Sequence, residues 1–110
     1  MKTAILVAAL SLVPCLSQAY EQTDLYESGA RSIVAASHGH FGEEYVQDFA
    51  SSALLMGAAE VATYEAKLGE RLPQGPGVSL VVYEVNDCVY SKVIVAINPE
   101  LSAQGLWYIE

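Results

Sequence analysis

Two histidines separated by one glycine, His38 and His40, are the side chains best suited to metal chemistry, and Glu43 and Glu44 follow closely. Imidazole nitrogens and carboxylate oxygens are competent ligands for zinc or copper, and Gly39 gives the backbone freedom to turn both rings inward. A strong site would show a further ligand at helical spacing, which this stretch lacks. The pattern therefore leaves two alternatives: a metal site of His38, His40 and Glu43, or a solvated loop between helices.

Glu60 is the one charged residue between Phe49 and Tyr64, and it lies at the edge of an apolar stripe. A carboxyl group held in apolar surroundings has a raised pKa and can serve as a general acid or base. The alternative is a rim position, with the stem on apolar surface and the head in water. The sequence contains no nucleophile elbow, P-loop, dinucleotide fingerprint or C-x-x-C motif. A small hydrolase using Glu60 is therefore a secondary hypothesis, and a non-enzymatic role is favoured.

Tyr83, Tyr90 and Trp107 are a third group of candidates, because all three fall on predicted strands. Aromatic residues on one face of a sheet are typical of binding surfaces, where they supply large contact area at low entropy cost. Cross-strand tyrosines also stabilise sheets without any binding role. The first interpretation predicts a partner-binding face formed by Tyr83, Tyr90 and Trp107.

The longest predicted element is a helix over about residues 43–70, followed by Gly69 and Pro73 as stop signals. Its apolar residues recur every three or four positions, at Val46, Phe49, Ala53, Gly57, Val61, Tyr64, Leu68 and Leu72. A helix of this length would measure about 45 Å, whereas a domain of this size is about 30 Å across. We therefore expect the helix either to break near Gly57 or to project and pack on a second copy as a homodimer.

A shorter helix from Thr23 to about residue 37 precedes the histidine loop and is expected to run antiparallel to the long helix. After the breaker cluster QGPG come two valine-rich strands, residues 78–85 and 88–97, and a short third strand at 106–109. A two-residue turn at Asn86-Asp87 would pair Tyr83 with Tyr90. It would also place Val82 and Val93 on a more aliphatic face, which we expect to pack on the long helix. The tyrosine face would then be only half covered.

The first nineteen residues read as a secretory signal peptide, with Lys2 as the basic start, an apolar core and a small-x-small site that predicts cleavage after Ala19. Residues 20–110 would then form a single domain. Only Cys88 remains after cleavage, either packed in the interior or paired between chains.

Residues 20–110 contain thirteen acidic residues and four basic ones, which gives them a net charge of −9. Such a surface repels phosphate backbones and anionic lipids, so neither nucleic acid nor membrane is an expected partner.

The sequence thus predicts an α+β fold, with an N-terminal helical pair on a C-terminal antiparallel meander of two to three strands. The favoured function is a secreted or periplasmic acidic protein that binds a protein partner, with inhibition of a basic protein as one form of it. There are two alternatives: binding of zinc or copper at His38 and His40, and a small hydrolase using Glu60. No other cofactor is expected.

Overall fold

The computed structural model describes residues 22–110, so the predicted signal peptide and its cleavage site lie outside the described residues. A first helix covers residues 22–36. The remaining elements follow in the order α2 Tyr45–Ser52, β1 Leu54–Leu55, α3 Ala58–Leu68, β2 Ser79–Glu84, β3 Lys92–Ile97 and β4 Ala103–Ile109. The four strands form one antiparallel sheet in the order β1-β2-β3-β4. The predicted α+β layout is confirmed, and the predicted third strand is β4.

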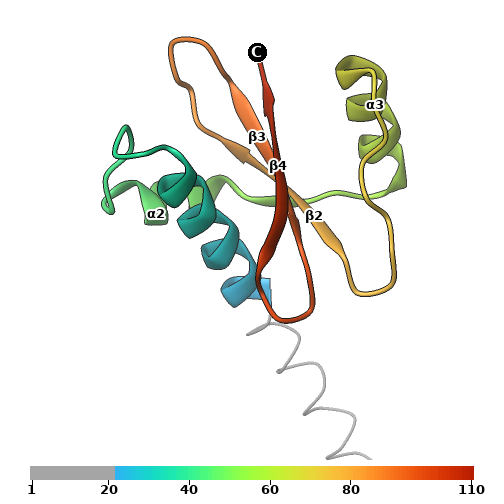
Figure 1. The fold of residues 1–110 in the computed structure, drawn as a ribbon, viewed down its shortest axis with the longest axis horizontal. Coiled ribbons are helices and arrows are strands. Elements are labelled where there is room, and N and C mark those ends of the chain that lie inside the picture. Colours follow the sequence, from blue (N-terminus) through green and yellow to red (C-terminus); the bar gives the residue numbers. More distant parts are fainter. Residues whose placement is uncertain (1–21) are drawn as a thin grey trace, which may run out of the picture.

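The sheet forms the middle of three layers, with the first helix and α2 on one face and α3 on the other (Figure 1). On the first face, the sheet contributes Val81, Tyr83, Val93, Val95 and Ile97 to a core that includes Ile33, Val46 and Phe49 from the helices. On the second face, it contributes Leu80, Val82, Ile94 and Ala96 to a core that includes Val61 and Leu72. Burial on both faces explains why the two central strands are almost continuously apolar rather than alternating.

The predicted long helix is interrupted between α2 and α3, which settles the question of a break near Gly57. The main chain leaves the helix at Ala53, and Leu54 and Leu55 pair with Val82 and Val81. This segment seals the outer edge of β2 and carries the chain from one face of the sheet to the other. Helical periodicity persists across the break because both helices need an apolar stripe, each for a different face. The middle segment, for which contact with a second copy was one of the alternatives, pairs with β2.

The hairpin register differs from the one predicted by a two-residue turn. Tyr83 pairs with Val93 rather than with Tyr90, so the predicted register is wrong. There are two causes. The turn lies at Cys88 and Val89, two residues later than predicted, because the N–H of Asp87 donates to the Tyr90 carbonyl. A bulge follows, in which the N–H groups of both Val85 and Asn86 donate to the carbonyl of Ser91. Asn86 has a φ of 47°, a left-handed conformation that asparagine tolerates better than most residues. The register of β3 relative to β2 is displaced by an odd number of residues, so the side chains of β3 lie on the opposite face from the one predicted. Val82 and Val93, which were predicted to share a face, therefore lie on opposite faces of the sheet.

The buried Tyr83 gives a pH prediction. Its hydroxyl donates to the Tyr26 carbonyl at 2.8 Å, and burial, followed by the nearby Tyr26, raises the pKa of the phenol far above its ordinary value. The unfolded phenol ionises near about pH 10, so this contribution to stability is intact below that pH and is lost as the pH rises above it. We expect Tyr83 to ionise only on unfolding, visible as a late, cooperative step in phenolate absorbance. A gradual titration without that step would contradict the buried position.

Candidate binding surface

The histidine loop is exposed and its groups are directed to different partners. His38 has a φ of 53° and is exposed, while the His40 ring lies 3.3 Å from the Asp87 carboxylate. Glu43 instead pairs with Arg31 on the first helix. The pKa of Asp87 is lowered, chiefly by the N–H of Cys88 and then by His40. Within residues 22–110 no three His, Cys, Asp or Glu side chains are placed to share a metal ion. Zinc or copper binding by His38, His40 and Glu43 stays a prediction.

Glu60 and Cys88 are both exposed. Glu60 is exposed, and its carboxylate accepts a hydrogen bond of 2.9 Å from the N–H of Gly57 at the start of α3. It therefore caps the start of α3, and a catalytic role for Glu60 stays a prediction. Cys88 is a free, exposed thiol in the loop between β2 and β3, so the expectation of a packed thiol is wrong.

The three predicted partner-binding aromatics do not form an open face. Tyr83 is fully buried and cannot contact a partner in this structure, which corrects the expectation of a half-covered tyrosine face. Tyr90 is partly buried beside Tyr108, with ring centroids 5.0 Å apart. Trp107 lies on the opposite face, half-buried, and its indole N–H donates to Glu70 at 3.1 Å.

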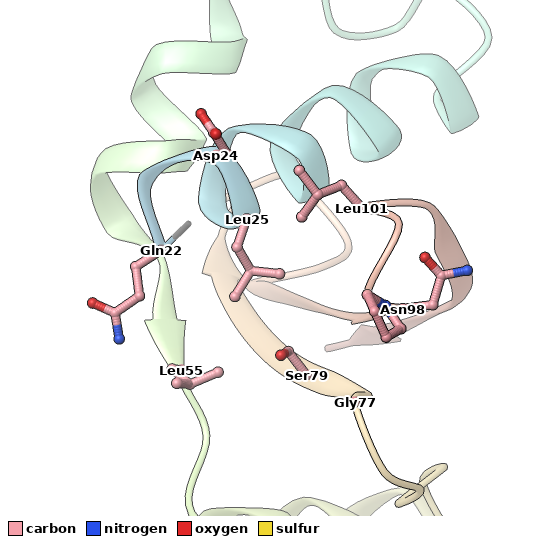
Figure 2. A pocket seen from close by; sticks show the side chains of 9 residues that line it. Gln22, Asp24, Leu25, Leu55, Gly77, Ser79, Asn98 and Leu101 are labelled. Atoms are coloured by element: carbon pink, nitrogen blue, oxygen red, sulfur yellow. The ribbon is translucent and has the colours of Figure 1, made fainter. Parts of the chain in front are cut away.

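A different surface combines a hollow with exposed apolar side chains. It lies where the start of the first helix, β1, the start of β2 and the β3–β4 turn meet, and it encloses about 450 Å³. Figure 2 shows Leu25 reaching from the first helix toward the middle of this hollow, with Leu55 on one side and Leu101 on the other. Leu55 and Leu101 are 44% and 38% exposed, so the hollow presents apolar side chains to solvent. We call this site the leucine hollow.

Leu101 is held at this site in a strained backbone conformation. Its φ of 64° lies in the left-handed region, which is costly for a leucine. The side chain of Asn98 holds the turn by accepting from the N–H groups of Glu100 and Ser102, and Ser28 of the first helix donates to the Leu101 carbonyl. These bonds fix a conformation that presents an apolar side chain to solvent.

The opposite wall of the hollow depends on a glycine. Gly77 has a φ of 79°, and a Cβ at this position would lie 2.6 Å from the Cγ of Pro99. The loop before β2 can therefore reach the β3–β4 turn only with glycine here. The QGPG cluster, noted in the sequence as a breaker alone, thus helps to shape the site.

The charged side chains at the leucine hollow are acidic. Asp24 lines it, Glu100 is exposed between two of its lining residues, and no Lys or Arg side chain lines it. Within the described part of the chain, no charged or polar residue is buried, so its acidic groups all contribute to the surface field. The arrangement suits an apolar group carried by a positively charged molecule.

Sequence reasoning missed the leucine hollow because its residues are far apart in the chain. Leu25, Leu55 and Leu101 come from three separate elements, and nothing in their spacing links them.

None of the helices within residues 22–110 is long and apolar enough to cross a bilayer. Comparisons with protein-family models, with curated proteins and with solved structures found no match.

Proposed function

We propose that this chain is an exported acidic protein that binds a basic protein partner and has no catalytic role of its own. The leucine hollow is where an apolar side chain of the partner docks. The observation that carries the proposal is Leu101, a leucine fixed at φ 64° and left 38% exposed beside the hollow. Backbone strain of this kind persists where the surrounding structure maintains it, and it is concentrated at functional sites.

Charge supports the basic character of the partner. Thirteen acidic residues outnumber the basic ones by far, and Arg31 is already paired with Glu27 and Glu43. A field of one sign speeds the encounter with an oppositely charged protein, while a central apolar contact gives most of the affinity. Inhibition of a basic protein is one form that such binding takes.

The test is a titration of residues 20–110, labelled for NMR, with a panel of basic proteins of pI above about 9 and one acidic protein of similar size. We expect shifts clustered around Leu25, Leu55 and Leu101 with a basic protein and none with the acidic one. Leu55→Ser combined with Leu101→Asn should weaken binding at least about tenfold, because buried leucine contacts are each worth about 1.5 kcal/mol or more. Asparagine is chosen at position 101 because it tolerates the left-handed backbone.

The matched control is Val89→Ser, which removes an apolar side chain that is 58% exposed at the other end of the β2–β3 hairpin. It should change the affinity by less than about twofold. If binding depended on charge attraction alone, the affinity of every variant would fall as salt is added, and replacing Leu55 and Leu101 would not change it. Equal affinities for the double variant and the control would therefore show that the hollow is not the binding surface.

A further inference from the structure

The outer edge of β4 is open. β4 is the last strand in the sheet order, and in Figure 1 it lies in front of the sheet with neither helical layer across it. Its seven residues, Ala103–Ile109, include no charged residue and no proline, and all but Ile109 are at least partly exposed. Natural edge strands usually carry a charge, a proline or a cover that prevents pairing with another chain.

The opposite edge of the sheet is protected, which makes the contrast informative. Beyond the two residue pairs between β1 and β2, the N–H of Met56 donates to the Leu80 carbonyl and the N–H of Glu84 donates to the Ser52 hydroxyl. Outward main-chain groups of Leu80, Val82 and Glu84 are therefore used within the chain. The fold closes one edge of its sheet and leaves the other available.

The hydrogen-bond pattern identifies which groups of β4 are available. The carbonyl of Ile109 accepts from the N–H of Ser91, so the main chain of Ile109 faces β3. Main-chain directions alternate along a strand, so Trp107 also faces β3, while Leu106 and Tyr108 face outward. Outside the β3–β4 ladder, no main-chain or side-chain hydrogen bond within residues 22–110 uses the N–H or C=O groups of Leu106 and Tyr108.

We propose that β4 pairs antiparallel with β4 of a second copy, about a twofold axis at Trp107, and joins two sheets into one. This register sets Leu106 opposite Tyr108 of the second copy and uses every outward group of both residues in four main-chain hydrogen bonds. If the twofold axis lay at Leu106 instead, Tyr108 would lie opposite Gln104 of the second copy. Gln104 is the extra residue on β4 at the bulge opposite Ala96 and Ile97, so this register would form fewer main-chain hydrogen bonds. The interface is the same patch on both copies, as a twofold axis requires.

Charge also favours this edge over the rest of the surface. Two copies of residues 20–110, each with a net charge of −9, repel each other. β4 contains no charged residue and therefore adds nothing to that repulsion. In the proposed register Glu110 lies opposite Gln104, so no carboxylate of the paired strands faces another. The proposal goes beyond the leucine hollow and does not depend on it.

The experiment measures the dimer dissociation constant of residues 20–110 by sedimentation, from about 1 µM to about 1 mM protein. We expect a dimer that tightens when salt is raised from about 20 mM to about 500 mM, because salt screens the repulsion between acidic chains. Trp107 is the single tryptophan, so its fluorescence should change over the same concentration range.

Position 104 tests the register. Gln104 is exposed, so its variants should fold. Gln104→Glu would oppose two carboxylates at each end of the interface and should raise the dissociation constant about fivefold, whereas Gln104→Lys should lower it. The control position is Ala62, on the exposed side of α3. Ala62→Glu and Ala62→Lys change the net charge by the same amounts as the two Gln104 variants. Each should change the logarithm of the dissociation constant by at most about half as much as the matching Gln104 variant.

Three results would overturn the proposal. The first is a chain that stays monomeric at every concentration, which would leave this edge to a strand of some other protein. The second is an equal response at positions 62 and 104, which would reflect net charge alone. The third is growth beyond the dimer, because pairing about a twofold axis at this edge closes after two copies.

Discussion

Replacing Gly29 by alanine is expected to destabilise the protein by about 3 kcal/mol. Gly29 lies buried in the first helix, and a Cβ there would meet the Tyr83 hydroxyl, lie 2.7 Å from the Tyr83 Cζ and lie 3.0 Å from the Cδ1 of Ile97. Alanine is the better helix former by about 1 kcal/mol, but this gain is smaller than the cost of moving a tyrosine that is fully buried. The displaced hydroxyl would also lose its bond to the Tyr26 carbonyl. Urea unfolding of residues 20–110 measures the difference.

Two variants separate the clash from a general effect of the substitution. Gly75→Ala is the matched control, because the nearest atom to a Cβ there is 3.8 Å away, and it should change stability by less than about 0.5 kcal/mol. Tyr83→Phe removes the atom nearest to the new methyl group, so the double variant should recover part of the loss. Strict additivity of Gly29→Ala and Tyr83→Phe would show that the two side chains do not meet.

Replacing Ile94 by alanine is expected to cost about 3 kcal/mol, within the range for a buried isoleucine. Ile94 is 0% exposed in the central strand β3, between Val82 and Trp107 in the sheet register and beneath the α3 layer. A register that pairs Tyr83 with Tyr90, as predicted from the sequence, would instead place Ile94 opposite Ser79 on the half-covered tyrosine face, where the cost would be much smaller. Thermal or urea unfolding therefore tests the observed pairing directly.

Leu54→Ala is the comparison for Ile94, since Leu54 is opposite Val82 but 65% exposed. Its loss should change stability by less than about 0.5 kcal/mol. Equal costs at the two positions would mean that α3 does not cover this face of the sheet as described.

The sequence predicted the types of element better than their pairing. Valine-rich strands after a helical half were readable from local pattern, and the α+β layout follows from them. The register was not readable, because it depends on a bulge at Val85 and Asn86 that a turn dipeptide does not report. The break between α2 and α3 was signalled by length alone. That Leu54 and Leu55 would form a strand depends on the open edge of β2, which is a tertiary feature.

The candidate site was the least predictable part. Tyr83 looked like a displayed aromatic in the sequence, yet it anchors the first helix through its hydroxyl. Leu101 lies between the predicted strands 88–97 and 106–109, where a single leucine gives no sign of a site. Its left-handed backbone and its neighbours Leu25 and Leu55 become visible only when the chain is folded. One local signal was available, because Asn98-Pro99 marks a turn whose side-chain bonds fix the loop.

The order of the layers has a consequence for how the chain is assembled. Both cores draw on strands β2 and β3, which lie in residues 79–97, whereas the helices that cover them come earlier in the chain. A growing chain therefore carries apolar helical stripes with nothing to bury them until those strands emerge. Its native contacts close over long sequence separations, which slows folding. Neither core can be completed before residues 79–97 have been synthesised, because both cores depend on β2 and β3.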